Sequence, residues 1–472
     1  MKFSIKEISF FERDVRLRMP FRFGVVTLTE APQAFVRARI VLQNKKESEG
    51  AAAELLAPKW FDKNPALSNE DNFEQLRHSM RAARALYLDS GSNTAYGHSR
   101  PTVGLVENFG PALLDRALLD ALCRALGVSF YEAVRTNLPR ISFSGLDMNL
   151  FLAGLEPASQ IAARHTVGLV DPITSLDNKT PVGDGLPETL EEVIARYGHR
   201  WFKLKVGGDV KADVERLSAI AAVLDRIPES YHASLDGNEQ YKDVDEVLAL
   251  WRAVKAEPRL KRLVASVVFI EQPIKRQNAL ARAELPAEHA VETVERQFEV
   301  TRERIRRIEG KALMKLLTAE KPVIIDESDD SLDAFPRARA LGYRGVSSKT
   351  CKGIYKSLIN AARCAAWGNG YFMSGEDLTI QAGIALQQDL ALVSILRLAH
   401  VERNGHHYVN GMAGLPAEEQ QRFLSSHDDI YERSHGAVRL RIDKGMIRMS
   451  SLDCPGYASK AMPDWQSMRR MP

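Results

Sequence analysis

Cysteine is scarce in this chain of 472 residues. The four cysteines are scattered and form no CxxC pair, which excludes a disulfide scaffold or a zinc ribbon and fits a reducing, cytoplasmic location. The chain also lacks any apolar run that approaches the ~18 residues a membrane-spanning helix needs. Residues 1–19 alternate apolar and charged side chains, so they predict a strand and not a signal peptide.

An excess of charge of either sign is also lacking. Lysine and arginine number 64, and aspartate and glutamate number 61, which gives a formal net charge of +3. This balance offers no electrostatic case for binding nucleic acid or an anionic membrane, so we expect neither as a partner. With 45% apolar residues, a chain of this length has enough material for a large core in two to four domains, or in one enlarged domain.

The first ~140 residues read as an α+β unit. Two segments alternate with period two, as strands do, and two others show the spacing of amphipathic helices. The predicted strands are 3–17 and 34–43, joined by a loop that contains Pro20 and Gly24, and the predicted helices are 69–88 and 107–127. Gly127 stands where a helix commonly ends on a left-handed glycine.

From residue 141 onward, short strand-like runs alternate with amphipathic helical stretches. Such alternation is typical of a parallel sheet, and about eight units indicate a (β/α) barrel. The predicted strands are 141–150, 201–206, 232–238, 267–273, 322–328, 345–350 and 371–377, with helices at 213–227 and 245–256. A loop rich in Gly, Pro, Asp and Asn at 165–187 is long enough to flank a site. The charged stretch within 274–320 is predicted to be an inserted helical excursion with a solvated face.

Two lysines lie inside one of these apolar strands. In the segment WFKLKV, Lys203 and Lys205 share one face, and the apolar residues share the other. One face of a barrel strand packs on helices and the other points into the barrel, so we expect both lysines to point inward. A buried ammonium group is costly unless carboxylates or a ligand compensate it.

The compensating carboxylates follow on the next strands. Asp236, Glu271 and Asp326 stand at the C-terminal ends of three successive strands, where barrel enzymes carry their chemistry, so we expect them to converge on one point. Oxygen ligands of this kind suit Mg²⁺ or Mn²⁺ and not zinc, since no Cys or His accompanies them. Lys349 ends the next strand with another cation.

Each of these residues also has an ordinary structural explanation. A single Asp at a strand end commonly caps a helix, and a single Lys commonly lies in solvent. Charged residues at the ends of six consecutive strands favour a functional site over a set of caps. For Asp377, which follows Glu376 at the end of the next run, a cap and a substrate contact are equal alternatives. His400, His406 and His407 show no ligand spacing and are interpreted as structural or surface residues.

Taken together, these motifs resemble the enolase superfamily, and within it the muconate-lactonizing-enzyme-like subgroup. The matching elements are Lys203-Leu204-Lys205, Asp236-Gly237-Asn238, Glu271-Gln272-Pro273, Ile325-Asp326-Glu327-Ser328 and Lys349 in SSKTCKG. Segment 112–134 is similar to the helix before the barrel, and 439–457 to the C-terminal return. The resemblance implies an N-terminal α+β capping domain (1–140), a modified TIM barrel of the (β/α)₇β type (141–410), and a C-terminal segment (411–472) that completes the capping domain.

The resemblance also implies an activity. It points to a Mg²⁺-dependent enzyme (Mn²⁺ is the alternative ion) that abstracts the proton α to the carboxylate of a small molecule through a metal-stabilised enediolate. Asp236, Glu271 and Asp326 would hold the metal. Lys205 would be the base on one face of the substrate, and Lys349 either the acid/base or a fixed cation on the other. The product would be that of a racemase, an epimerase or a cycloisomerase, and we expect a homo-oligomer.

Substrate contacts follow from the same resemblance. The expected contacts are Lys203, Asn238, Arg22, Glu376 and Asp377. Lys203 would stay charged and touch the substrate carboxylate, and its charge together with the metal favours loss of the Lys205 proton. Arg22 and its neighbour Phe23 would act from a 19–29 loop over the barrel mouth, with an ordinary connecting loop as the alternative.

Departures from the motifs of related enzymes, and other classes of protein, narrow the activities that fit the sequence. The segment Gly375-Glu376-Asp377-Leu378 lacks the Asp-x-Asp of dipeptide epimerases, and no His occupies the position of Lys349, so a dipeptide substrate and sugar-acid dehydration are both disfavoured. A dehydratase of a hydroxy acid stays open as an alternative. A Schiff-base aldolase using Lys205 or Lys349 would need no three-carboxylate site. A non-catalytic, metal-stabilised binding protein would explain the carboxylates but not the inward lysines.

Overall fold

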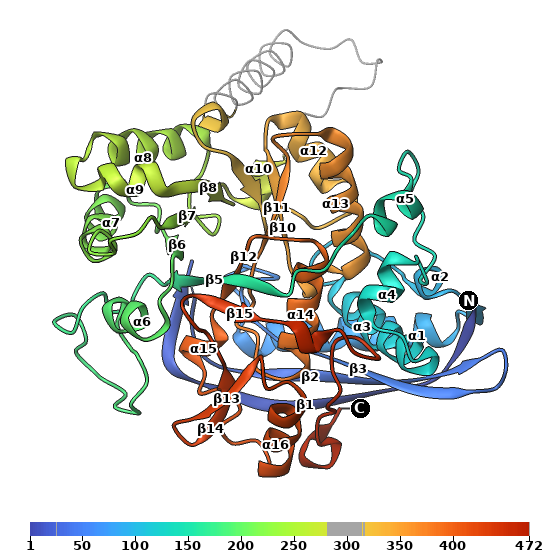
Figure 1. Cartoon of the computed structure of the whole chain (residues 1–472). Helices are drawn as coiled ribbons and strands as arrows, with labels where there is room; N and C mark the ends of the chain where they lie inside the picture. The colour runs from blue at the N-terminus through green and yellow to red at the C-terminus, as the bar shows by residue number, and fades with distance from the viewer. Residues whose placement is uncertain (25, 281–313, 315–316, 472) are drawn as a thin grey trace, which may run out of the picture.

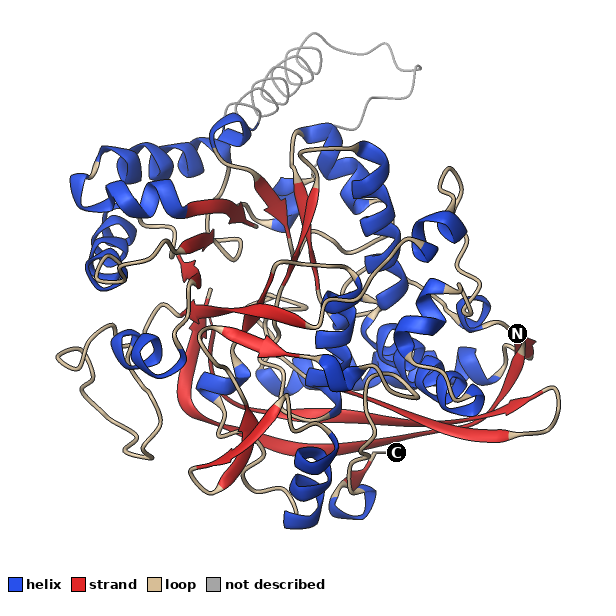
Figure 2. Cartoon of the chain, viewed as in Figure 1, coloured by secondary structure: helices blue, strands red, loops and turns tan. Residues whose placement is uncertain are grey.

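An antiparallel sheet with helices on one side packs against a parallel barrel (Figures 1 and 2). The computed structural model describes residues 1–24, 26–280, 314 and 317–471. The antiparallel sheet has the order β16-β1-β2-β3, and the short strand β4 also pairs with β1. Its strands are β1 (Phe3–Phe23), β2 (Val26–Leu42), β3 (Glu47–Leu55), β4 (Ser92–Asn93) and β16 (Arg469–Arg470). This sheet and its helices form the capping domain.

The predicted loop near residue 20 is wrong in its extent, because β1 and β2 continue to the tip of one long hairpin. Their pairing runs on to Phe23 opposite Val26, with a register shift between Arg16 and Phe21. Pro20 falls within that shift, where the ladder hydrogen bond that proline cannot donate is already interrupted. The hairpin tip thus stays extended.

The helices of the capping domain lie as the sequence predicted. Helix α1 (Asn69–Leu88) begins with a capping box between Ser68 and Asp71. Helix α3 (Phe109–Leu126) ends at Gly127, whose φ of 71° confirms the predicted left-handed cap. At Gly50 of β3, an added Cβ would lie 2.2 Å from the backbone nitrogen of Ala121 in α3, so helix and sheet approach closely only with glycine there. The shorter helices are α2 (Ala95–His98), α4 (Phe130–Arg135) and α5 (Met148–Ala153).

Eight parallel strands close into the barrel. They are β5 (Gln160–Val167), β6 (Trp201–Lys205), β7 (His232–Asp236), β8 (Val267–Glu271), β9 (Val323–Ile325), β10 (Gly345–Ser348), β11 (Phe372–Gly375) and β12 (His400–Arg403). Each pairs with the next in parallel, and β12 returns to pair with β5, His400 opposite Ala162. Seven strands are followed by a helix before the next strand and the eighth closes the ring, which confirms the predicted (β/α)₇β barrel.

The helices around the barrel are α6 (Leu190–Tyr197), α7 (Val210–Leu224), α8 (Val244–Ala256), α9 (Lys261–Ser266), α10 (Arg276–Ala279), α12 (Ala334–Leu341), α13 (Ile354–Trp367) and α14 (Ile384–Ile395). Of these, α7 and α8 lie where the amphipathic pattern predicted helices. None of the described helices is long and apolar enough to cross a membrane. Most of the predicted 274–320 insertion lies outside the described residues.

Two barrel strands were not predicted, and one predicted strand is wrong. Residues 141–150 are irregular and enter helix α5, and the first strand is β5. This strand is buried on both faces and carries Arg164, His165 and Thr166, so it shows neither an apolar run nor a clean alternation. The eighth strand, β12, has the sequence HVER with a single apolar residue, so no apolar run marks it.

The C-terminal segment contacts both the barrel and the capping domain. Its elements are α15 (Gly405–Tyr408), α16 (Ala417–Ser426), β13 (Tyr431–Ser434), β14 (Ala437–Leu440) and β15 (Met446–Arg448). Strand β15 adds antiparallel to β5, with Ile447 opposite Ile161. The final strand β16 pairs with β1, with Arg470 opposite Phe11. The return of the tail to the capping domain is therefore confirmed.

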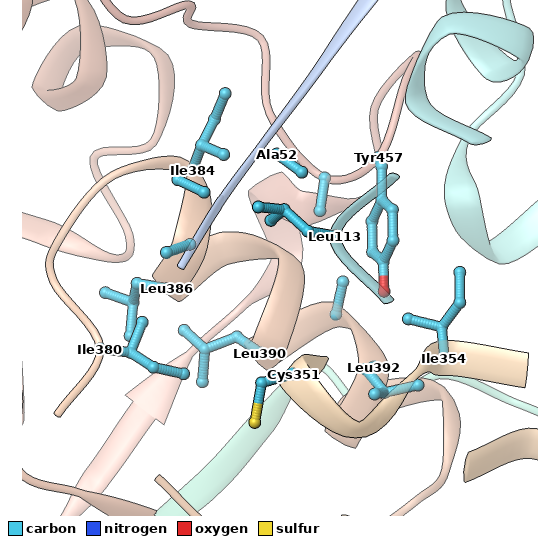
Figure 3. Packing of buried hydrophobic residues seen from close by; sticks show 14 of the residues in the cluster. Ala52, Leu113, Cys351, Ile354, Ile380, Ile384, Leu386, Leu390, Leu392 and Tyr457 are labelled. Carbon is cyan, nitrogen blue, oxygen red and sulfur yellow. The ribbon is translucent and has the colours of Figure 1, made fainter. Parts of the chain in front are cut away.

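One hydrophobic core runs without interruption from the capping domain into the barrel. Figure 3 shows Ala52 of β3 and Leu113 of α3 beside Ile384 and Leu390 of α14, with Tyr457 of the C-terminal segment at the same contact. A second core lies under the outer barrel helices, around α7 and α8. Because the first core includes both units, the capping domain and the barrel hold each other in place.

A buried ion pair lies at this junction. Arg116 of α3 donates to Glu54 of β3 at 3.0 Å, and both side chains are at most 1% exposed. Thr350, at the barrel, donates to the same carboxylate at 3.2 Å. Burial raises the pKa of Glu54 to about 7, although Arg116 opposes the shift. Glu54 therefore depends on Arg116 to remain ionised.

Replacing Arg116 with leucine is expected to lower the free energy of unfolding by about 3–5 kcal/mol, because the Glu54 carboxylate loses its buried partner. Equilibrium denaturation in urea measures the change. The double variant Arg116→Leu/Glu54→Leu is the control, and it should recover most of the loss because no charge remains buried. A loss below ~1 kcal/mol in the single variant would contradict this account.

Candidate functional site

The charged ends of the barrel strands meet inside the barrel around the ammonium group of Lys203. Four carboxylates surround its Nζ: Asp236 at 2.9 Å, Glu271 at 2.8 Å, Glu376 at 2.7 Å and Glu402 at 3.0 Å. They come from β7 and β8 and from the ends of β11 and β12. Burial disfavours the charged form of Lys203, but the four carboxylates raise its pKa well above the usual value. Lys203 therefore points into the barrel, as predicted.

Two of the carboxylates around Lys203, Glu376 and Glu402, also bind buried side chains that the sequence did not reveal. Arg164 of β5 donates to Glu376, and Thr166 of the same strand donates to Glu402 at 2.6 Å. Burial opposes ionisation of Glu402, but Lys203 and other nearby lysines lower its pKa well below the usual value. Arg164, Thr166 and Glu402 belong to the two unpredicted strands; the only available signal was the charged end of the segment HVER.

Lys205 shares the Asp236 carboxylate of the neighbouring strand with Lys203. Lys205 Nζ donates to Asp236 Oδ2 at 2.6 Å, and Asp236 Oδ1 accepts from the backbone N–H of Asn238 at 2.8 Å. Asn238 stands in the left-handed region, with φ of 40°, which a tight Asp-Gly-Asn turn requires. Its side chain donates to Glu327 at 3.2 Å. The turn therefore fixes Asp236 beside Lys205.

Lys349 and Asp326 form the corresponding pair across the barrel. Lys349 Nζ donates to Asp326 Oδ2 at 2.7 Å and lies 4.2 Å from the ring centre of Trp60 in the capping domain. Ser347 and Lys352 contact the other oxygen of Asp326. Burial disfavours the charge on Lys349, yet Asp326 raises its pKa well above the usual value. Burial likewise opposes ionisation of Asp326, but Lys349 and Lys352 hold its pKa well below the usual value.

A pocket between the barrel and the capping domain joins these groups. Its lining residues are Phe21, Phe23, Leu28, Ala57, Trp60, Lys203, Lys205, Asn238, Lys349, Asp377, Leu378, Thr379, Glu402 and Asn404. The barrel supplies the lysines and the polar groups. The hairpin tip and the segment around Trp60 supply an apolar wall. Of the predicted site residues, the pocket brings together the three lysines, Asn238 and Asp377.

The remaining predicted substrate contacts lie elsewhere. Arg22 has an exposed side chain and is not among the lining residues, because strand alternation directs Phe21 and Phe23 inward in its place. Glu376 lies deeper, bound to Lys203 and Arg164. Asp377 lines the pocket, but its carboxylate accepts the backbone N–H groups of Ile380 at 2.9 Å and Asn404 at 2.5 Å. These two bonds join the loops after β11 and β12, and they are not those of the helix N-cap considered for Asp377, because α14 begins only at Ile384 with Gly383 as its N-cap.

The three predicted metal ligands surround the site but do not meet at a single point. Among the described residues, only one set of His, Cys, Asp or Glu places three ligand atoms within 4.8 Å of one another, and it consists of three histidines on the outer side of the barrel wall. Lys203 lies between Asp236 and Glu271, while Asp326 turns to Lys349 and Lys352. The expected convergence is thus incomplete here, because lysines hold the carboxylates apart.

The donor set nevertheless fits a hard divalent cation. Both oxygens of Glu271 are buried without a hydrogen bond, although Lys203 lies near one of them. Burial and the neighbouring Asp236 raise the pKa of Glu271 well above the usual value. The charge of Lys203 alone therefore does not offset the burial of Glu271 and its carboxylate neighbours. Lys203 has two further partners, Glu376 and Glu402, so it keeps carboxylate neighbours if a cation takes Asp236 and Glu271.

Residues 185–309 match the protein-family model described as "Enolase C-terminal domain-like". No match was found among curated protein sequences. Among solved structures, the muconate lactonizing enzyme of Pseudomonas fluorescens, complexed with muconolactone, is 18% identical with a TM-score of 0.61, over 98% of this chain and 97% of that one. The N-succinyl Arg/Lys racemase of Bacillus cereus is 16% identical with a TM-score of 0.60, over 98% and 96%.

A dipeptide epimerase from Cytophaga hutchinsonii, complexed with Mg and a dipeptide, is 13% identical with a TM-score of 0.59, over 100% of this chain and 99% of that one. At such identities the structural likeness establishes the fold and leaves the substrate open. The motifs, the barrel with its capping domain and the matched segment agree with one another. The chain has the fold that these solved structures share, and residues 185–309 match the enolase C-terminal domain-like family model.

Proposed function

We propose that this protein is a Mg²⁺-dependent enzyme that removes the proton α to the carboxylate of a small molecule. One observation carries the proposal: Lys205 and Lys349, from the second and sixth barrel strands, line the same pocket, and each is ion-paired with a different predicted metal ligand. Both lysines keep an ammonium group at the pocket while a carboxylate compensates each charge. Two such groups on opposite sides of one pocket are suited to bind and react with a carboxylate substrate.

The metal would be held by Asp236, Glu271 and Asp326. When bound, Mg²⁺ supplies positive charge to the substrate carboxylate, which makes the α-proton more acidic. Glu271 supports this assignment most directly, since its buried oxygens have no hydrogen bonds and its pKa is raised. The Mg-containing epimerase of similar fold is consistent with the same ion.

Lys205 would act as the base on one face of the substrate. Its ammonium is paired with Asp236, which fixes the position of the nitrogen. A base must be a neutral amine, and Lys205 would take the α-proton from this position at the pocket. Lys203 itself stays charged between Glu376 and Glu402 and is placed to contact the substrate carboxylate.

Lys349 would act from the other side of the pocket. Its ammonium is held by Asp326 and lies over the ring of Trp60, so its position is fixed from the barrel and from the capping domain. In this position it serves either as the second acid/base or as a fixed cation that stabilises the negative charge of the enediolate. A lysine on each face is what two-base chemistry requires, so a racemase or epimerase is favoured, with a cycloisomerase or a dehydratase as the one-base alternatives.

The pocket wall indicates the rest of the substrate. Phe21, Phe23, Leu28 and Trp60 border the pocket opposite the lysines. Apolar walls of this kind bind hydrocarbon by removing it from water. We therefore expect a carboxylic acid whose distal part is apolar. Incubation with carboxylic acids and Mg²⁺ in D₂O, followed by loss of the α-proton NMR signal, tests the proposal.

Replacing Lys203 with methionine is expected to tighten Mg²⁺ binding by about tenfold or more, a change of ~1.4 kcal/mol or more. The substitution removes a positive charge that competes for Asp236 and Glu271, while proton exchange should be lost with the substrate contact. Isothermal titration calorimetry measures the affinity. The variant's fold should be checked by thermal unfolding without metal, because Glu376 and Glu402 lose a buried partner. Weaker Mg²⁺ binding in a folded variant would show that Lys203 supports the metal rather than competing with it.

A further inference from the structure

Three histidines form a buried cluster outside the barrel interior. They are His165 of β5, His199 in the link from α6 to β6, and His406 of α15, and one ring nitrogen of each lies within 4.8 Å of the others. Arg164 and Thr166 of β5 point into the barrel, so His165 between them points to the outer side. In Figure 1, α6 and α15 flank β5 on this side. The cluster is therefore separate from the lysine pocket.

The ring nitrogens of this cluster lack protein partners. Buried ring nitrogens without a hydrogen bond are Nδ1 of His165, Nε2 of His199 and both nitrogens of His406. All three side chains are at most 8% exposed. Buried polar atoms are nearly always bonded, so four such nitrogens in one place require an explanation. A ligand that accepts several nitrogen lone pairs at once supplies one.

His199 is already oriented as a ligand. Its Nδ1 donates to the backbone oxygen of Ala163 at 2.9 Å, which leaves the lone pair of Nε2 free. In metal-binding histidines, a hydrogen bond from the nitrogen that does not bind the metal to a carbonyl oxygen orients the ring in the same way. Burial lowers the pKa of His199 to about 4 and holds the pKa of His165 and His406 well below the usual value. The rings are therefore neutral, as ligands must be.

We propose that His165, His199 and His406 form a binding site for a divalent transition metal of the zinc class. Imidazole nitrogens suit Zn²⁺ and its neighbours, whereas Mg²⁺ prefers oxygen. Tetrahedral zinc with Zn–N bonds of ~2.0–2.1 Å holds its nitrogens about 3.3 Å apart, so the rings close by small rotations from their present separation. Three histidines leave a fourth position open.

Positively charged side chains around the cluster favour an anion in the fourth coordination position of the metal. Arg403 and Arg439 face His406, and Arg18 faces His407, the next residue of α15. Arg18 is paired with Asp184 and Arg403 with Asp389. A dication beside these guanidinium groups needs a negative charge of its own, so the fourth ligand is an anion such as hydroxide or chloride.

The site would connect three elements that support the pocket. His165 is in the first barrel strand, His199 precedes the strand of Lys205, and His406 is two residues from Tyr408, whose ring stacks on Phe21 of the pocket wall at 4.2 Å. A metal here acts as a structural clamp on the outer wall of the barrel. The proposal does not depend on the proposed enzymatic function.

The test is titration of chelator-treated, full-length protein with Zn²⁺ in the presence of excess Mg²⁺, which occupies the oxygen site. We expect one Zn²⁺ per chain, a higher midpoint of thermal unfolding with Zn²⁺, and visible absorption typical of tetrahedral coordination with Co²⁺ as the probe. His199→Phe and His406→Phe should weaken Zn²⁺ binding by more than about 100-fold, since loss of an outer partner alone costs 10–100-fold.

Two variants serve as controls. His78→Ala removes an exposed histidine of α1, and Asp236→Asn changes the predicted Mg²⁺ site; both should bind Zn²⁺ as the wild type does. Absence of Zn²⁺ binding by the wild-type protein, or equal binding by the folded His199 and His406 variants, overturns the proposal. If those variants do not fold, the Co²⁺ spectrum of the wild type decides, because absorption without tetrahedral character overturns it equally.

Discussion

Lys205→Ala is expected to lower Mg²⁺-dependent exchange of the substrate α-proton with solvent by about 10²–10⁴-fold, the usual contribution of a positioned base. Lys205 is buried, lines the pocket and is oriented by Asp236. Alanine removes the amine and leaves no other group of β6 in its place. Lys349→Ala is expected to lower exchange by about 10²–10³-fold if Lys349 only stabilises charge. Proton NMR in D₂O measures both.

The pattern of loss distinguishes two-base from one-base chemistry. In a racemase or epimerase, Lys205→Ala retains exchange of one stereoisomer and loses the other, and Lys349→Ala does the reverse. In a cycloisomerase or dehydratase, one substitution abolishes exchange and the other slows it. Lys356→Met is the matched control, because this buried lysine is paired with Asp329 and does not line the pocket. Wild-type exchange in both the Lys205 and Lys349 variants would remove the pair from the mechanism.

Glu271→Gln is expected to abolish stabilisation by Mg²⁺ together with proton exchange. Glu271 contributes two buried oxygens without hydrogen bonds, and glutamine keeps the shape but loses the charge. In the wild type, Mg²⁺ at 100 times its Kd should add ~2.7 kcal/mol to the free energy of unfolding, an increase that the variant should lack. Thermal unfolding with and without Mg²⁺ measures it.

Glu239→Gln is the control for this substitution. Glu239 is a buried carboxylate near the same strand ends, but Arg276 and Lys63 already bind it, so Mg²⁺ stabilisation should persist. Asp236→Asn and Asp326→Asn should behave as Glu271→Gln does. An unchanged Mg²⁺ response in all three variants would falsify the assignment of the metal ligands.

The barrel strands that end in charge were the part of the fold most readily predicted from sequence. Strands β6 to β8 end in a charged residue, and β9 to β11 are each followed directly by one, so a charged residue marked the end of every strand in this series. The first and last strands were missed because β5 and β12 carry polar or charged side chains in place of an apolar run. Their side chains Arg164 and Glu402, which complete the surroundings of Lys203, were missed with them.

The other differences between the prediction and the structure depend on contacts that form only in the folded chain. Pro20 suggested a loop, but a register shift lets the hairpin continue, which directs Phe21 and Phe23 inward and Arg22 outward. His165, His199 and His406 are separated by 34 and 207 residues, so no spacing rule relates them until the barrel closes. The lysine contacts to the carboxylates likewise depend on side-chain geometry that a sequence does not specify.

The most direct test of the proposed chemistry is a screen of carboxylic acids with apolar distal groups, incubated in D₂O with the full-length protein and Mg²⁺. The account predicts at least one acid whose α-proton signal disappears with Mg²⁺, persists with chelator, and persists with the Lys205→Ala/Lys349→Ala double variant. Borohydride trapping run in parallel should leave no covalent adduct. Covalent capture of a carbonyl substrate on Lys205 or Lys349, with no metal-dependent exchange of any acid, would contradict the account and favour Schiff-base chemistry.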